Sequence, residues 1–378
     1  MAAVVRGNEP ADDVAEGATR KHRSMPMLLQ GQDYFFRSPS NVLDFQERMH
    51  RSGMVADFSA DPVPCVLVLA RADDMEMNEL SLALAEVGIR MVRLDADRCL
   101  DVALTVYTDA PLVEYEQWLL RPMLVWRRHF DLTALPVDAT TVQGAYVHEQ
   151  WRAVAGWLSG RGDWEQINPF RVTQHLDRLT QLSDAASFGL TVPRTTVTTL
   201  PGRNRPGGAS CIVKTAGKHL LEPEPGELRG LFPRPLDTRR VGEALEPAPV
   251  LVQQYLSSEY ELRVFVVGED ILAYRVEKVD PAELWVDPDA VSVTSVEVPD
   301  ELGEKLLGLS RHWRLHVAAF DILVTDGDFV FLEVNVNCDW RWFERRAGCG
   351  AVSDAVHRWV AARFDELASA PRRGGKRH

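Results

Sequence analysis

The spacing of hydrophobic residues divides the chain into an α/β part followed by an α+β part. Residues 63–70 are an unbroken, largely β-branched apolar run, which predicts a buried strand of a parallel sheet. Apolar residues at helical spacing over 76–87 are followed by Gly88, a helix stop signal, and 89–94 then predicts a second strand. We therefore expect a βαβ unit within an α/β domain over 62–165. A further strand and a helix of this domain are predicted at 122–128 and 145–159.

The second half has a different texture. Residues 168–186 predict a helix, 211–214 a strand that ends in lysine, and the dense Pro and Gly between 200 and 249 predict loops. From 250 onward the pattern favours antiparallel strands, with a turn at 268–270. The strands are expected at 250–256, 261–267, 271–277, 319–325 and 329–337, and helices at 300–312 and 350–368. This divides the second half into a central unit, 166–256, and a C-terminal unit, 257–370.

The two ends fall outside these units. Residues 1–61 predict a polar, partly disordered N-terminal extension, and 371–378 a basic tail. Within the extension a helix is expected near 40–52, and the segment 25–60 suggests no function of its own. The chain has 378 residues, which suits two or three domains, and 46% hydrophobic residues, which is ample for a large core.

Charge and cysteine usage narrow the class of protein. The formal net charge of -13 opposes binding to nucleic acid or to an acidic membrane, so neither is an expected partner. Five scattered cysteines without a CxxC pair indicate reduced thiols rather than a disulfide framework or a zinc site. No apolar run suits a signal peptide or the roughly 18–20 residues that cross a bilayer. We expect a cytoplasmic protein.

The strongest chemical feature is the segment FDILVTDGDFVFLEVNVN. Because side chains alternate along a strand, Glu333 and Asn335 share a face, and Asp321 lies on the partner strand. A two-residue loop would set Asp321 opposite Leu332, whereas a three-residue loop, 326–328, would set it opposite Glu333. We predict the odd loop, because it places three oxygen side chains on one face, a donor set that suits Mg²⁺. The alternative is that Glu333 and Asn335 simply face solvent, as polar residues of antiparallel sheets usually do.

Two further segments carry candidate phosphate and nucleotide contacts. Lys214 ends an apolar strand beside a Gly-containing loop, where its ammonium group can neutralise phosphates; the alternative is an edge lysine with a solvated head. After the strand at 250, Gln253 and Tyr255 form a polar break that can contact adenine. Glu261 can then accept the ribose hydroxyls, and Arg263 can bind a phosphate or a carboxylate. The alternative for this last pair is a cross-strand ion pair.

Other catalytic patterns are missing from the sequence. It contains neither a G-x-x-x-x-G-K-[ST] nor a G-x-G-x-x-G nucleotide motif. A G-x-S-x-G elbow and an H-E-x-x-H metal motif are also absent, and the ten histidines show no metal-ligand spacing.

Taken in order, these features resemble the ATP-grasp ligases, with the greatest likeness to graspetide (microviridin-type) peptide maturases. The likeness runs from about 63 to 368 and includes the VWRR strand, Glu149 in HEQW and the segment QLSDAASFGLTVPRT. It implies an ATP-grasp fold preceded by a small N-terminal βαβ domain, with the nucleotide between the central and C-terminal subdomains.

The resemblance also implies a role for each candidate residue. Asp321, Glu333 and Asn335 match the Mg²⁺ ligands, and Lys214 matches the phosphate-binding lysine. Gln253 and Tyr255 match the adenine hinge, Glu261 the ribose contact, and Arg263 the catalytic position on the phosphate or acyl side. Arg178 stands where the family carries a lysine and keeps its charge as a bulkier fork.

This chain departs from the family at the substrate side. The family segment E-V-N-P-N-G reads EVNVNC here, so Val336 and Cys338 replace Pro and Gly. The family segment D-W-R is represented only by LWVDP at 284–288, without its arginine.

The implied reaction uses ATP and Mg²⁺ to activate a carboxylate as an acyl phosphate, which an amine or hydroxyl then attacks. The expected partner is a ribosomal precursor peptide, in which side-chain ester or amide bonds form, or an amino-acid carboxylate; a homodimer is compatible with either. Two alternatives stay open: a ligase that adds a free amino acid, and an inactive ATP-grasp protein that binds peptides. A short neighbouring reading frame rich in Thr, Ser, Lys, Asp and Glu would favour the precursor peptide.

Overall fold

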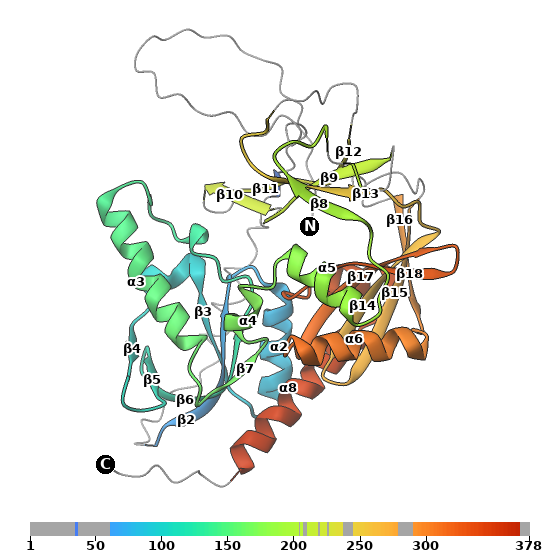
Figure 1. Ribbon diagram of the computed structural model, residues 1–378. Coiled ribbons are helices and arrows are strands. Elements are labelled where there is room, and N and C mark those ends of the chain that lie inside the picture. Colours follow the sequence, from blue (N-terminus) through green and yellow to red (C-terminus); the bar gives the residue numbers. More distant parts are fainter. Residues whose placement is uncertain are drawn as a thin grey trace, which may run out of the picture.

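The structure is a computed structural model that describes residues 35–36, 61–203, 205–206, 210–217, 220–224, 227–236, 245–278 and 290–370. The helix expected near 40–52, the segment 284–288 and the basic tail lie outside the described residues. Figure 1 shows an N-terminal α/β part beside a C-terminal sheet, with a smaller sheet above them.

The N-terminal part is built on a parallel sheet, as its hydrophobic pattern predicts. The order is β3-β2-β6-β5-β4, with β7 beside β6. Strands β2, β3, β6 and β7 pair in parallel, and β5 and β4 continue the sheet antiparallel. The strands are β2 (Val63–Ala70), β3 (Met91–Asp95), β4 (Leu104–Val106), β5 (Val113–Tyr115), β6 (Trp118–Arg127) and β7 (Glu165–Ile167). The helices are α2 (Met75–Glu86), α3 (Val142–Leu158) and the 3₁₀ turns η2 (Ala96–Asp101) and η3 (Leu132–Ala134).

The predicted βαβ unit is confirmed. Strand β2 has the predicted bounds, 63–70. Its last six residues are buried, as expected of an apolar strand in a parallel sheet. Helix α2 begins after Asp74, whose side chain accepts a hydrogen bond from the Met77 N–H and caps the helix. Gly88, with φ of 77°, then ends the helix and turns the chain toward β3.

The second half contains two antiparallel sheets. A four-stranded sheet has the order β12-β9-β13-β8, and a five-stranded sheet has the order β16-β15-β14-β17-β18. The first comprises β8 (Thr195–Thr198), β9 (Cys211–Thr215), β12 (Arg234–Pro235) and β13 (Val250–Gln254). The second comprises β14 (Tyr260–Val267), β15 (Asp270–Lys278), β16 (Val291–Val296), β17 (Val317–Thr325) and β18 (Asp328–Asn335). A small sheet adds β10 (Leu220–Glu224), β11 (Glu227–Gly230) and β1 (Phe35–Phe36), which pairs with β11.

One helix prediction is wrong in detail. The helix expected over 168–186 is split into α4 (Phe170–Thr173) and α5 (Arg178–Ser187). Asp177 makes the break, because its carboxylate accepts the Leu179 and Thr180 N–H groups and starts a new helix. The helix expected over 350–368 is confirmed as α8 (Ala351–Ser369). An additional short helix, α7 (Arg341–Ala347), precedes it and ends at Gly348 with φ of 67°. The predicted helix over 300–312 is confirmed as α6 (Asp300–His312).

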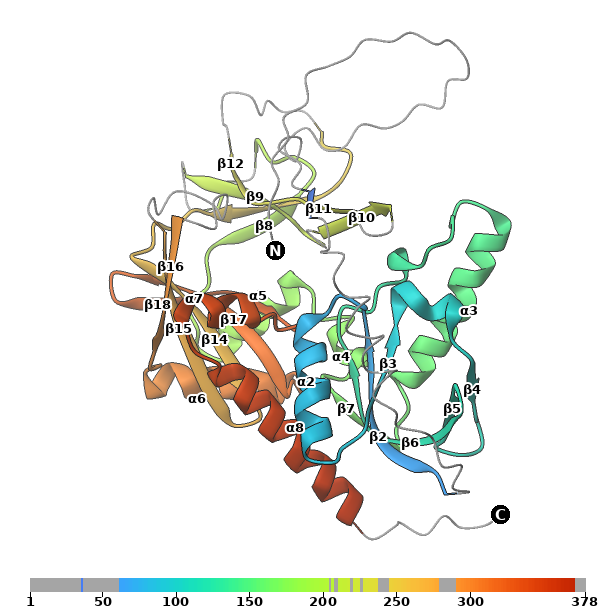
Figure 2. The same cartoon turned by 180° about the vertical axis from the view of Figure 1, so that it is seen from behind.

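The C-terminal sheet is covered on both faces, and one of these layers joins it to the N-terminal part. Helix α6 packs on one face, through a core that contains Leu306, Val264 and Phe320. Helix α8 lies between the other face and α2, and the views from front and back agree on this (Figures 1 and 2). That second core includes Val66 of β2, Val267 of β14 and Val356 of α8 in one cluster. No helix in the described segments is long and apolar enough to cross a membrane.

Candidate nucleotide and metal site

The hairpin of β17 and β18 carries the predicted metal ligands, but its loop differs from the prediction. Thr325 pairs with Asp328, so the loop has two residues, Asp326 and Gly327, with φ of 51° and 81°. Positive φ at both loop residues matches the turn that Asp-Gly favours in two-residue hairpins. The predicted three-residue loop is therefore wrong.

A β-bulge nevertheless brings the acidic residues together. The register shifts between Asp321 and Ile322, because Ile322 pairs with Phe331 while Asp321 pairs with Glu333. Leu332 is the extra residue of the bulge. Asp321 and Glu333 thus lie opposite each other, and the Asn335 Nδ2 donates to Asp321 Oδ2 at 2.9 Å. The three predicted oxygen side chains therefore meet on one face. A β-bulge sets their register, and not the odd loop length that was predicted.

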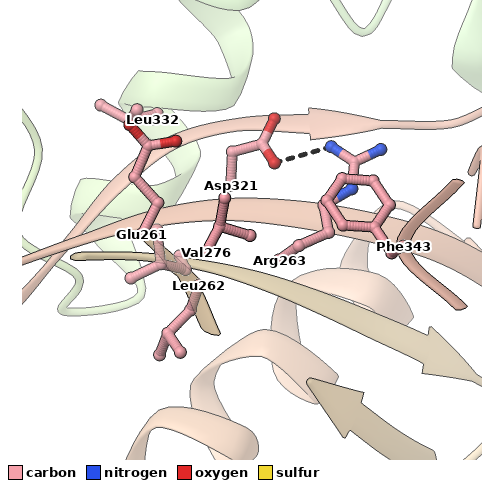
Figure 3. A pocket seen from close by; sticks show the side chains of 8 residues that line it. Glu261, Leu262, Arg263, Val276, Asp321, Leu332 and Phe343 are labelled. Atoms are coloured by element: carbon pink, nitrogen blue, oxygen red, sulfur yellow. Dashed lines mark hydrogen bonds and ion pairs between the residues drawn. The ribbon is translucent and has the colours of Figure 1, made fainter. Parts of the chain in front are cut away.

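Two arginines bind these carboxylates. Arg263 of β14 donates from Nη1 to Asp321 Oδ1 at 2.6 Å (Figure 3). Arg178, at the start of α5, donates from Nε to Glu333 Oε2 at 2.8 Å. The same guanidinium donates from Nη1 to the Thr215 carbonyl at 2.8 Å, so it bridges β9 and β18. Burial and the nearby Glu333 raise the pKa of Asp321, while Arg263 opposes that shift.

Lys214 faces the same cluster from the central sheet. It lies on β9, and the pKa of Lys214 is lowered by burial, while the charges of Glu333, Asp321 and Glu261 act in the opposite direction. The Lys214 side chain is therefore partly buried near these carboxylates and is not a fully solvated edge lysine. Lys214 pairs with Leu251 on β13, so the apolar side chains of Ile212 and Leu251 share its face.

The hinge residues lie at the end of the same face. Gln253 pairs with Ile212, is buried, and donates from Nε2 to Thr195 Oγ1 at 2.9 Å. The Tyr255 N–H donates to the Ser210 carbonyl at 3.0 Å, and the Gln254 N–H to the Arg194 carbonyl. These two backbone donors are therefore used within the protein.

Glu261 and Arg263 do not pair with each other. The Glu261 carboxylate accepts a hydrogen bond from Lys278 Nζ of the neighbouring strand β15, whereas Arg263 forms an ion pair with Asp321. Glu261, Arg263 and Asp321 line a small pocket with apolar walls of Val276, Leu332 and Phe343 (Figure 3). Glu261 and Arg263 are the residues to which the family resemblance assigns the ribose and acyl contacts.

The donor chemistry of the bulged hairpin fits Mg²⁺. Within the described residues, no three His, Cys, Asp or Glu side chains form a metal-binding group. Two carboxylates with one amide oxygen are instead the sparse set that Mg²⁺ accepts when phosphates and waters complete its shell. Burial is the main cause of the raised pKa of Asp321, the charge of Glu333 adds to it, and a divalent cation would neutralise both carboxylates.

Sequence reasoning missed a buried charge cluster beside this site. Arg128, directly after β6, has a fully buried side chain that binds Asp74 at 2.8 Å and Asp339 at 2.7 Å. His129 Nε2 also contacts Asp339 Oδ1 at 2.7 Å. The one available signal was the basic pair that ends the VWRR strand, because a buried strand rarely ends in two arginines without partners.

No protein-family profile and no curated protein matches the chain. Solved structures do match. The macrocyclase MdnC from Microcystis aeruginosa MRC, bound with precursor peptide MdnA, is 19% identical; the match covers 79% of this chain and 99% of that chain, with a TM-score of 0.67. The RiPP-associated ATP-grasp ligase of Chryseobacterium gregarium, in complex with ADP and a leader and core peptide, is 18% identical, with coverage of 84% and 100% and a TM-score of 0.65.

A third solved structure gives the same result. The ATP-grasp ligase PsnB, complexed with a phosphomimetic variant of its minimal precursor, Mg and ADP, is 20% identical, with coverage of 79% and 100% and a TM-score of 0.62. The protein therefore has the fold of the ATP-grasp ligases, and the predicted fold class is confirmed. The fold extends over nearly the whole length of these three ligases.

Proposed function

We propose that the protein is a Mg-ATP-dependent ligase that activates a side-chain carboxylate of a ribosomal precursor peptide and joins it to a hydroxyl or amine. The observation that carries this proposal is the bulged hairpin, which holds Asp321, Glu333 and Asn335 together opposite Lys214. Carboxylates facing a buried lysine across two sheets suit a triphosphate with its metal ion.

Each residue of the site then has a defined task. Lys214 neutralises phosphate charge, and the apolar face of Ile212 and Leu251 supports the base. Asp321, Glu333 and Asn335 would hold Mg²⁺, which supplies positive charge to the phosphates when it is bound. Arg263 orients the carboxylate and stabilises charge on the acyl phosphate. Arg178 links the two sheets through Glu333 and the Thr215 carbonyl, and holds the Glu333 carboxylate in place.

The peptide substrate is supported by the solved relatives of this fold. MdnC was solved with a precursor peptide, the Chryseobacterium gregarium ligase with ADP and peptide, and PsnB with Mg and ADP. Arg263 gives this chain a buried cation that can bind the carboxylate of such a peptide. A cytoplasmic location, supported by five free thiols, and a homodimer are part of the same proposal.

The test uses the full chain, Mg-ATP and a synthetic peptide encoded by the short reading frame beside the gene. We expect a mass loss of one water for each bond formed, with an equal amount of ADP and phosphate. A mass gain equal to an added amino acid would identify the amino-acid ligase instead. Peptide binding without ADP formation would identify an inactive binding protein.

A further inference from the structure

The boundary between the N-terminal domain and the C-terminal sheet contains an ordered carboxylate, Asp339, that the proposed site does not use. In the parallel sheet, β3 and β6 lie on opposite sides of β2, so the direction in which successive strands are added to the sheet reverses at β2. Ligands of such sheets bind outside the carboxyl ends of the strands at this switch point. Here those ends carry Arg128 and His129, directly after β6, and the Arg128 N–H bonds the Leu69 carbonyl of β2.

Asp339 reaches this point from the other side. It follows the proposed metal ligand Asn335 by four positions, so the same segment runs from the metal hairpin to this boundary. Arg128 fixes the path, because its Nη1 donates to the Cys338 carbonyl at 2.9 Å. Cys338 itself has φ of 57°, the left-handed conformation that glycine favours, and this turns the chain toward Asp339.

One oxygen of Asp339 is held and the other is available. Oδ1 accepts from Arg128 Nη2 at 2.7 Å and lies 2.7 Å from His129 Nε2. Asn337 Nδ2 lies 3.1 Å from His129 Nδ1, so the network assigns the ring proton to Nε2, which donates to Asp339. Oδ2 has no partner in the described part of the chain, and the side chain is 58% exposed. A carboxylate that is fixed on one side and open on the other can receive a substrate group.

Along the chain, Asp339 lies midway between the metal hairpin and a residue of the pocket. Phe343, four residues after Asp339, lines the pocket with Arg263, and its ring centroid lies 5.1 Å from the Arg263 guanidinium carbon. Asn335, four residues before Asp339, donates to Asp321, which Arg263 also binds. Burial raises the pKa of Asp339, but the charges of His129, Arg128 and Arg263 together hold it below its ordinary value. An acyl phosphate bound at Arg263 would therefore have Asp339 nearby.

We propose that Asp339 is a catalytic residue that binds the attacking hydroxyl or amine of the substrate, while Arg128 and His129 act as positioning residues. The inference rests on the proposed ligase function and adds the acceptor side of the site. Asp339 Oδ2 accepts a hydrogen bond from the nucleophile and directs its lone pair at the acyl carbonyl.

The chemistry balances without another reactant. As the nucleophile adds, a C–O or C–N bond forms and the proton on the nucleophile becomes strongly acidic. That proton passes to Asp339 Oδ2. The acyl C–O bond to phosphorus then breaks, and phosphate leaves with the bonding electrons. Product release returns the proton to solvent and restores the ionised carboxylate.

The test separates activation of the carboxylate from attack on it. The substitution is Asp339→Asn, which keeps an oxygen for Arg128 and His129 but places an amide nitrogen at the open position. The probe is hydroxylamine, a small nucleophile that traps acyl phosphates as hydroxamates without help from a base. Wild-type and variant chains are incubated with Mg-ATP and the peptide encoded beside the gene. Mass spectrometry then measures both the crosslinked peptide and the hydroxamate.

We expect Asp339→Asn to lower crosslinking by about 100-fold or more and to leave the rate of hydroxamate formation within about twofold of wild type. Asp270→Asn is the matched control, because Asp270 is 54% exposed and also binds an arginine, Arg358, at 2.8 Å. It should change neither rate. Retained trapping also demonstrates that the variant is folded.

Three outcomes would overturn the inference. Crosslinking by Asp339→Asn at the wild-type rate would remove Asp339 from the reaction. An equal loss of crosslinking and trapping would make Asp339 a structural residue. If the variant crosslinks more slowly than wild type only at low peptide concentration, then Asp339 contacts the peptide without taking part in the reaction. A wild-type chain that forms neither product with Mg-ATP and peptide would instead contradict the proposed function itself.

Discussion

Glu333 and Asp321 each bind an arginine in this structure, at 2.8 and 2.6 Å, although both are proposed metal ligands. The guanidinium groups supply the positive charge that two neighbouring carboxylates require. Under the proposed function, bound Mg²⁺ would supply this positive charge in addition to the guanidinium groups or in place of them. Loss of the Arg178–Glu333 ion pair would also remove a link between the two sheets, because Arg178 bonds the Thr215 carbonyl on the central sheet.

Replacing Glu333 by Gln should lower ATP turnover by more than about 100-fold, since loss of even an outer partner of a metal site costs 10- to 100-fold. The fold should persist, because the amide oxygen can still accept from Arg178. Glu277→Gln is the control: Glu277 lies in the same sheet and is also bound by an arginine, Arg275. ADP release and thermal unfolding are measured for both variants. Near-normal ADP release by folded Glu333→Gln would exclude the metal role.

Individual site residues differ in how far the sequence predicted them. Period-two alternation placed Glu333 and Asn335 on one face, and the structure agrees because that rule is local. The partners Arg178 and Arg128 could not be derived in this way. Arg178 binds a residue 155 positions away, and Arg128 one that is 211 positions away. Such pairs depend on how whole subdomains pack, which a single sequence does not reveal.

At the scale of elements, the bulged hairpin shows two local signals in competition. The pair Asp326-Gly327 favours a two-residue turn, and the structure has that turn. Regular pairing from this turn would set Asp321 opposite Leu332, so the bulge is needed to bring Glu333 into place. The turn could have been predicted from Asp-Gly alone. The bulge could not, because one extra residue in a strand leaves no distinct pattern in the sequence.

Gly327→Ala should destabilise this hairpin by about 1 kcal/mol, because alanine tolerates the observed φ of 81° poorly. Nothing lies within 4 Å of an added Cβ at Gly327, so backbone strain is the main cost. Gly162→Ala is the matched control, since its Cβ would also meet open space and its φ lies outside the left-handed region. Urea unfolding compares the two variants. Equal stabilities would contradict the strained-turn interpretation.

For the whole molecule, the N-terminal domain and the C-terminal sheet behave as one packed body. Val66, Val267 and Val356 belong to a single core, and Trp126 stacks on Trp340 across the boundary at 6.5 Å between ring centroids. The hydrophobic pattern predicted both domains, since each has its own period of apolar residues. It could not predict that α2 and α8 share a core, because an apolar helix face does not identify the element it packs against.

Arg128 joins the two sides of this boundary. Its side chain is fully buried, it pairs with Asp74 of the N-terminal domain, and it donates to the Cys338 carbonyl beyond β18. Replacing it by Met would leave the buried Asp74 carboxylate without its cation and the carbonyl without a donor. We expect a loss of about 3–5 kcal/mol in the free energy of unfolding.

Arg127→Met provides the control for Arg128→Met. Arg127 is the neighbouring residue, and its guanidinium packs 3.8 Å from the Phe170 ring centroid and donates to the Phe130 carbonyl. It makes no ion pair with a carboxylate in the described ranges, so its loss should cost about 1 kcal/mol. Urea unfolding gives the stabilities, and hydrogen exchange at β6 and at 336–340 shows whether the boundary opens first. If Arg128→Met costs no more than Arg127→Met, and exchange at 336–340 stays slow, then apolar packing alone holds the boundary. A large loss with early exchange at both segments would show that the buried arginine holds the boundary closed, together with the segment that carries Asp339.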